Sequence, residues 1–107
     1  MKTEIVNVRK FNKQRPHFDI YIGRAVRYTE FTKNSIWYNP FKLPNGSNDV
    51  ERQEVLDLYE EYIKKKIAVD PVKYDLESLR GKVLGCWCKP LKCHGDILLK
   101  LLEAFHE

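Results

Sequence analysis

The stretch that decides the fold is K-V-L-G-C-W-C-K-P-L-K-C-H-G-D, from Lys82 to Asp96. Its first part, Lys82 to Cys88, predicts a strand, because it is short, apolar and rich in residues that suit a buried pleated surface. The segment from Asp96 to His106 predicts a helix, since its apolar residues recur at helical spacing. Pro90 breaks the turn between them, Lys89 to His94. In open α/β sheets, ligands bind where such strands end and helices begin.

The amino-terminal half predicts two strands and a structured loop. Glu4 to Arg9 indicates a first strand, and Phe18 to Ile22 a second one with period-two alternation. The segment from Ala25 to Asn34 fits either an irregular connection or a short strand. Ser35 to Leu43 is aromatic-rich but contains Pro40, which cannot donate to a strand ladder, so this segment predicts a loop.

Two helical segments follow. Val50 to Ala68 carries an apolar stripe, made of Val55, Leu58, Tyr59, Tyr62, Ile63 and Ile67. It begins after the turn signal of Pro44 to Asp49, where Asn48 or Asp49 can cap it. Asp75 to Arg80 predicts a short helix with Asp75 as N-cap and Gly81 as its stop.

The element order β-β-loop-α-α-β-α favours an α/β protein. Val83 to Cys88 is apolar on both faces, as a central strand covered by helices would be. With 107 residues the chain suffices for one compact domain. We therefore expect a single small domain, residues 1–107, with a short central sheet flanked by helices; an α+β sheet is the alternative.

Composition narrows the class of protein and its partners. Hydrophobic residues make up 43% and charged residues 32%, as in ordinary globular proteins. No apolar run approaches a membrane span and the N-terminus lacks an apolar signal core, so we expect a cytoplasmic protein without membrane contact. The net charge of +4 favours an anionic small molecule or nucleic acid as partner. The sequence does not indicate an oligomeric state.

The clustered cysteines allow a structural metal site. Cys86, Cys88, Cys93 and His94 supply the ligand count of tetrahedral zinc. Their C-x-C-x4-C-H spacing differs from zinc ribbons and knuckles, which take ligand pairs from two separate places in the chain. We therefore expect no cofactor, with zinc as the alternative.

A reactive or binding pocket is the second interpretation. Cys93 near a helix N-terminus would have its thiolate stabilised by the helix dipole and by the neighbouring lysines. His94 could carry protons, and Asp96 could orient a partner. This makes Cys93, His94 and Asp96 candidate catalytic residues. The backbone N–H groups of the helix start could also hold a phosphate.

Plain burial is the third interpretation. Cys86 and Cys88 point to the same face of a strand and Trp87 to the other, so both thiols could be small core hydrophobes. His94 would then cap or pack, and Asp96 would serve the helix dipole. This interpretation suits Cys86 best, because the turn that carries Cys93 and His94 should face solvent.

Further ligand-binding candidates lie elsewhere in the chain. Arg24 follows Gly23 at a strand end, where its guanidinium could match a phosphate, although a surface salt bridge is the simpler interpretation. Trp37 lies in the aromatic loop and could stack on a base, although such a cluster more often pins a loop. Asn39 is polar within that cluster and needs partners. With Cys88, these residues complete the predicted site.

The motifs resemble a known family. I-G-R at Ile22 to Arg24, N-P-F at Asn39 to Phe41, and L-R-G-K-x-L-x-C-W-C-K-P-x-x-C-H-G-D at Leu79 to Asp96 are similar to domain-of-unknown-function family 4326, small phage and bacterial proteins. The family commonly shows W-G-N-P-F, where this chain has Tyr38 in place of the glycine. The resemblance implies that these motifs surround one pocket, and that the setting is a virus or mobile element, hence a host cytoplasm.

Two hypotheses follow. The first is a domain that binds a nucleotide or another phosphorylated ligand at the pocket of Arg24, Asn39 and the Cys93-His94-Asp96 helix start, and that could act on it. The second is a non-catalytic nucleic-acid-binding or interaction module, possible also in a zinc-stabilised form. The sequence does not decide whether the protein is an enzyme.

Overall fold

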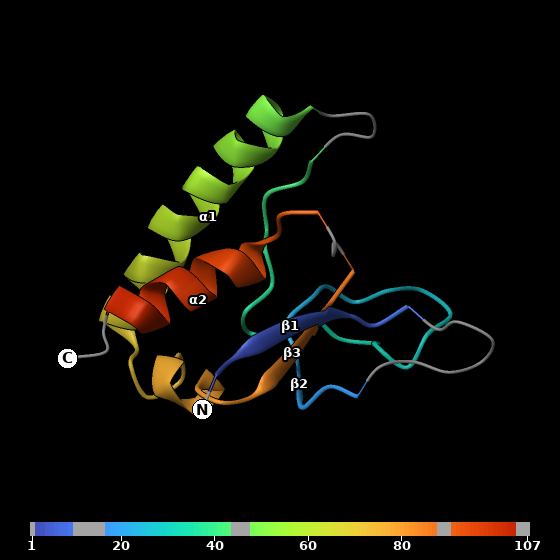
Figure 1. Ribbon diagram of the computed structural model, residues 1–107, viewed down its shortest axis with the longest axis horizontal. Helices are drawn as coiled ribbons and strands as arrows, with labels where there is room; N and C mark the ends of the chain where they lie inside the picture. Colours follow the sequence, from blue (N-terminus) through green and yellow to red (C-terminus); the bar gives the residue numbers. More distant parts are fainter. Residues whose placement is uncertain (1, 10–16, 44–47, 88–90, 105–107) are drawn as a thin grey trace.

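The computed structural model describes residues 2–9, 17–43, 48–87 and 91–104 (Figure 1). Their elements follow the predicted order. They are β1 (Glu4–Asn7), β2 (Ile20–Tyr21), α1 (Asp49–Val69), the 3₁₀ turn η1 (Leu76–Leu79), β3 (Val83–Cys86) and α2 (His94–Ala104). No helix in this described part of the chain is long and apolar enough to cross a membrane.

The sheet is parallel throughout and confirms the α/β class. Its strand order is β1-β3-β2, so β3 is the central strand, as its apolar composition predicts. Leu84 of β3 lies opposite Ile5 of β1 and Ile20 of β2. The carboxyl ends of the strands therefore meet at one edge of the sheet, the edge at which α/β proteins place their ligands.

The two faces of the sheet differ. Both helices pack on the face of Leu84 and Cys86, where α1 and α2 lie side by side (Figure 1). The opposite face is closed by an aromatic cluster of Phe18, Tyr21, Phe31 and Trp87. Gly85 faces this cluster, and a Cβ there would lie 2.4 Å from Val8 Cγ1. The helices thus flank the sheet on one face only.

α1 begins where the turn signal predicts. Asn48 is the N-cap, and its side chain and that of Glu51 form a reciprocal capping box. The buried stripe is centred on Leu56, Tyr59 and Ile63. The predicted stripe was wrong at Leu58, which is 52% exposed. Leu58 follows Leu56 by two residues, about 200° around the helix, and so faces away from the core.

Other boundaries also differ from the prediction. The Asp75 side chain caps nothing, and η1 is a 3₁₀ turn, because the N–H and Oγ of Ser78 both donate to the Asp75 carbonyl. α2 begins at His94, two residues earlier than expected. The predicted elements also covered Cys88, Pro90 and residues 105–106, which lie outside the described residues.

Candidate functional site

A pocket of about 610 Å³ opens at the carboxyl edge of the sheet. One wall comes from the segment after β2, Gly23 to Val26, and another from the end of β3 and the start of α2. The loop of residues 39–43 and the first turns of α1 complete it. The pocket therefore collects segments that are far apart in the sequence.

The charged side chains of the pocket are all basic. Arg24, Lys42, Arg52 and Lys92 line it, and none of its described lining residues is an Asp or Glu. The remaining wall is largely apolar, including Phe41, Leu43, Val55, Trp87 and Leu91. Several cations facing one partly apolar cavity create a positive potential that attracts anions.

Arg24 joins two sides of this pocket. Its Nε donates to the Asn39 carbonyl over 2.8 Å, and its Nη2 donates to the Phe41 carbonyl over 3.0 Å. A guanidinium has further N–H donors, which leaves Arg24 able to bind an anion. Asn39 Oδ1 accepts from the Phe41 N–H over 2.9 Å, so the loop is held and the Asn39 amide NH₂ remains a donor.

A chain of hydrogen bonds fixes the backbone around Arg24. Trp87 Nε1 donates to Tyr21 Oη over 2.8 Å, and Tyr21 Oη donates to the Arg24 carbonyl. The Tyr21 hydroxyl lies against Gly23: a Cβ atom at Gly23 would be 2.5 Å from the Tyr21 hydroxyl oxygen. Gly23 is therefore needed for close approach, and it contributes no side-chain contact to a ligand.

His94 is a buried wall residue in a defined tautomer. It is 7% exposed, and its Nε2 lies 2.6 Å from the Ile22 carbonyl oxygen. A carbonyl only accepts, so Nε2 carries the hydrogen and the neutral ring leaves Nδ1 as an acceptor. Burial lowers the pKa of His94, and the nearby Arg24 charge lowers it further. The ring is therefore neutral near pH 7.

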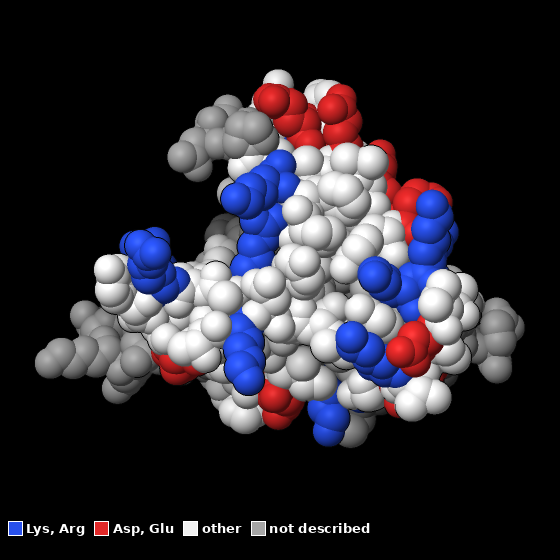
Figure 2. All heavy atoms as spheres, turned by 180° about the vertical axis from the view of Figure 1, so that it is seen from behind, with Lys and Arg blue, Asp and Glu red and all other residues white. Residues whose placement is uncertain are grey.

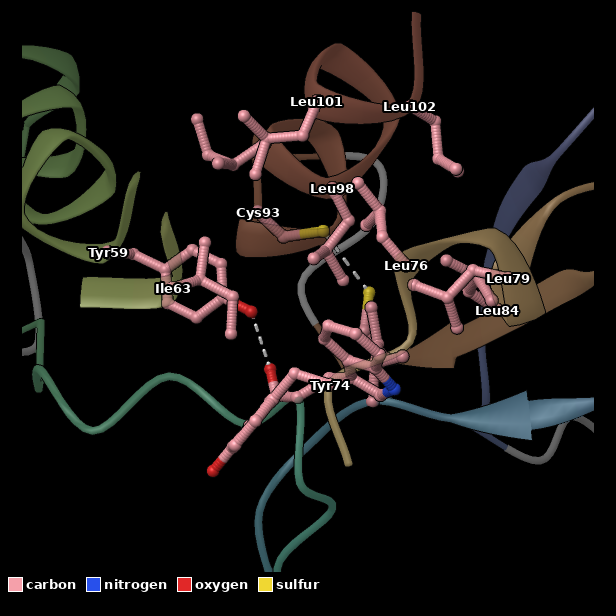
Figure 3. Close-up of a cluster of buried hydrophobic side chains, with 14 of the residues drawn as sticks. Tyr59, Ile63, Tyr74, Leu76, Leu79, Leu84, Cys93, Leu98, Leu101 and Leu102 are labelled. Atoms are coloured by element: carbon pink, nitrogen blue, oxygen red, sulfur yellow. Dashed lines mark hydrogen bonds between the residues drawn. The ribbon is translucent and has the colours of Figure 1, made fainter. Parts of the chain in front are cut away.

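Cys86 and Cys93 form a thiol pair in the same wall. Their sulfur atoms lie 3.4 Å apart, and both side chains are buried. Figure 3 draws this contact as a dashed line from the labelled Cys93 into the core. The hydrogen bond to Cys86 and burial raise the pKa of the Cys93 thiol well above its usual range. The stabilised thiolate predicted for Cys93 was thus wrong, because the Cys93 side chain is itself buried against Cys86, although Leu91 and Lys92 before it are exposed.

Two other predicted site residues lie outside the pocket wall. The Asp96 carboxylate accepts from the Cys93 backbone N–H over 3.0 Å, so it caps α2. Trp37 is 3% exposed, and its ring packs edge-on against Tyr74 in the core. Its carbonyl accepts from Tyr59 Oη over 2.8 Å (Figure 3). Trp37 therefore pins the loop and presents no face for stacking.

A comparison with models of known protein families identifies the family of this chain. The family model described as domain of unknown function DUF4326 matches residues 6–104. The chain belongs to this family. It is 33% identical over 96 residues to the uncharacterized 12.4 kDa protein in the nrdA-td intergenic region of Enterobacteria phage T4, covering 89% of this chain and 77% of the relative.

A second viral relative is similarly distant. Uncharacterized protein R718 of Acanthamoeba polyphaga mimivirus is 31% identical over 99 residues, covering 83% of this chain and 70% of the relative. No solved structure matches the chain. Neither the family description nor the names of these relatives states a function. A proposal about function therefore has to be argued from the residues of the pocket.

The metal alternative for this DUF4326 chain stays a prediction. Within the described ranges, no group of three or more His, Cys, Asp or Glu side chains surrounds one point. Cys88, the fourth ligand of the zinc alternative, lies outside those ranges. Cys86 and Cys93 are close enough to share a metal, while His94 directs Nε2 to the Ile22 carbonyl.

Three pocket cations were not predicted as site residues. Lys42, Arg52 and Lys92 come from the loop, from α1 and from the turn before α2. The position of Arg52 in the sequence could have marked it as a candidate site residue. A cation near a helix N-terminus is unfavourable for the helix dipole, so its presence there suggests another role. In the structure its Nη1 donates to the Lys92 carbonyl over 3.2 Å, which links α1 to the turn.

Proposed function

We propose that this protein binds a small phosphorylated ligand, such as a nucleotide, in the pocket at the carboxyl edge of its sheet. One observation carries the proposal: Arg24, Lys42, Arg52 and Lys92 face this pocket without a carboxylate among its described lining residues. Confining like charges around a cavity costs free energy unless an anion neutralises them. Guanidinium and ammonium groups bind a phosphoryl group through strong, charge-assisted hydrogen bonds.

The apolar part of the wall suggests what the phosphate is attached to. Trp87 is 37% exposed although it is large and aromatic, and Leu91 is 54% exposed. Both line the pocket beside Lys92. A ligand with an anionic end and a flat or apolar end would satisfy both parts of the wall, and a nucleotide combines a phosphate with an aromatic base.

His94 supplies a hydrogen-bond acceptor among these cations. No buried side-chain nitrogen or oxygen of the described residues lacks a partner, and the Nε2 of His94 donates to Ile22. The Nδ1 atom is therefore the ring atom left to face the pocket, where it accepts from a ligand hydroxyl. If the protein acts on its ligand, a neutral imidazole fits proton transfer better than the protonated Cys93 thiol fits nucleophilic attack.

Binding of an extended nucleic acid is the competing function. Figure 2 shows, on the face seen from behind, blue side chains separated by neutral and red ones, with red gathered at the top where α1 begins. A continuous basic stripe is the usual footprint of nucleic-acid binding, and this face does not have one. Trp37 is buried, so it cannot stack on a base.

Titration calorimetry with pyrophosphate and ADP tests the proposal. We expect saturable binding that Arg52→Gln and Lys92→Gln each weaken about tenfold or more, because each removes a charge-assisted contact. Arg27→Gln and Lys65→Gln are the matched controls: they remove the same charges from exposed positions that do not line the pocket. They should change the affinity little.

Three results would contradict the proposal. Absence of binding at low salt would remove the pocket as an anion site. Equal losses in the pocket and control variants would show that net charge alone attracts the ligand. Tight binding of single-stranded DNA with a steep salt dependence, unaffected by pyrophosphate, would favour the nucleic-acid function instead.

A further inference from the structure

The thiol pair in the pocket wall has a geometry that the ligand-binding function does not use. Cys86 ends β3, and Cys93 immediately precedes α2. Their sulfur atoms are 3.4 Å apart, whereas a disulfide bond is about 2.05 Å long, so an approach of about 1.3 Å would join them. Both residues line the pocket of about 610 Å³, so the pocket is the side from which a small reagent would approach their sulfur atoms.

We infer that Cys86 and Cys93 form a reversible disulfide, and that this bond weakens the binding of the phosphorylated ligand in the same pocket. The first part stands on the sulfur geometry alone. The second part rests on the proposed function. The protein would then hold its ligand in a reducing environment and release it on oxidation.

The oxidation is a two-electron step with a hydroperoxide as oxidant. One thiolate attacks the peroxide oxygen, which breaks the O–O bond, gives a sulfenic acid and releases water once the leaving oxygen is protonated. The second thiol attacks that sulfur, forms the S–S bond and expels a second water. Two thiols and one hydrogen peroxide thus give one disulfide and two waters. A dithiol reductant reverses the step by thiol–disulfide exchange.

Bond formation would disturb the residues that face the ligand. Lys92 and His94 flank Cys93, and Trp87 follows Cys86; all three line the pocket. The Cys93 sulfur is packed against the first turn of α2, within 3.3 Å of where a Cβ of Gly95 would lie. Moving the Cys93 sulfur toward β3 therefore shifts the start of α2. The Lys92 ammonium and the His94 imidazole move with it. A ligand in the pocket should shift the equilibrium between the dithiol and the disulfide toward the dithiol, because the coupling between ligand binding and disulfide formation is reciprocal at equilibrium.

Peptide mapping and calorimetry on the full chain test both parts. The protein is treated with hydrogen peroxide, alkylated, and digested with chymotrypsin, whose cleavage after Trp87 separates Cys86 from Cys88. We expect a Cys86–Cys93 cross-link that dithiothreitol reverses. Pyrophosphate should bind the oxidised protein about tenfold or more weakly than the reduced protein. In the Cys86→Ser variant, peroxide treatment should not lower the affinity for pyrophosphate in this way.

Each other outcome overturns a stated part. The proposed Cys86–Cys93 disulfide is refuted if the thiols stay reduced, if only one of them is oxidised, or if the cross-link involves Cys88. A Cys86–Cys93 bond with unchanged pyrophosphate affinity refutes the control of binding. Reduced protein that binds no pyrophosphate refutes the proposed function and the control together, while the cross-link still decides whether the pair is redox-active.

Discussion

At the scale of single residues, His94 carries the most specific chemistry of the site. Its tautomer follows from the 2.6 Å contact between Nε2 and the Ile22 carbonyl oxygen, and its neutral state follows from burial. The residue thereby couples the pocket to the backbone just after β2. It also links the protonation of one ring to the stability of the fold.

The stability of the protein should depend on pH through His94. Its pKa is lowered in the folded state and normal, about 6.5, in the unfolded chain, so the unfolded chain binds more protons between the two values. The free energy of unfolding should therefore fall as the pH drops below about 6.5, by at most about 1.4 kcal/mol per pH unit from this group. Urea unfolding at pH 7, 6 and 5 measures it.

His94→Gln is the matched variant. The glutamine Nε2 can still donate to the Ile22 carbonyl, but it does not titrate. The difference in unfolding free energy between wild type and His94→Gln should shrink as the pH falls from 7 to 5, because carboxyl groups titrate alike in both proteins. A constant difference over that range would show that His94 is not the titrating group.

Cys93 shows why residue chemistry was only partly predictable. The sequence correctly placed it beside a helix start, which favours a thiolate. Whether that start faces water depends on packing against Cys86 and the core, and no local pattern encodes such contacts. The hydrogen bond to Cys86 and burial raise the pKa of the Cys93 thiol, which the helix dipole was expected to lower. The prediction that Trp37 stacks on a ligand was wrong for the same reason. Aromatic residues occur both in cores and in binding sites, and only the packing of the fold shows which of the two applies.

At the scale of elements, the start of α2 holds the site together. The Asp96 carboxylate accepts from the Cys93 N–H, and the Asp96 N–H donates to the Cys93 carbonyl over 2.9 Å. These bonds fix the turn that carries Lys92 and His94. The aspartate predicted as a catalytic residue is thus placed to position the pocket from outside its wall.

Removing this cap should destabilise the fold. Asp96→Ala should lower the free energy of unfolding by about 1 kcal/mol, measured by chemical denaturation, because it removes the carboxylate that accepts from the Cys93 N–H at the start of α2. Asp96→Asn keeps an acceptor oxygen and should lose less. Glu103→Ala, at an exposed position of the same helix, should stay within about 0.5 kcal/mol of wild type. An Asp96→Ala variant as stable as Glu103→Ala would refute the capping role.

The order of elements was predictable because periodicity reports local geometry. Period two in Phe18 to Ile22 and helical spacing after Asn48 each follow from which side chains face the core. The exact register was harder. Leu58 was assigned to the buried stripe, but the stripe follows Leu56, since contact with the sheet and α2 decides which face of α1 is covered.

At the scale of the whole molecule, the fold brings together charges that the sequence keeps apart. Arg24, Lys42, Arg52 and Lys92 lie on separate segments, yet they line one pocket. The segments that follow β2 and β3 meet at one edge of the sheet, and the loop of residues 39–43 and α1 close over that edge. The sequence predicted Arg24 from its place at a strand end. It did not predict Lys42 or Arg52, because their proximity to the other cations depends on how α1 packs over the sheet.

The central claim is that an anionic ligand binds at this edge. A titration of isotope-labelled protein with pyrophosphate, followed by amide NMR shifts, tests it most directly. Saturable shifts should concentrate at Arg24, Lys92, His94 and Gly95, and amides of residues 64–67 near the end of α1 should not move. Shifts confined to that lysine-rich end of α1, or no saturable shifts at all, would contradict the claim.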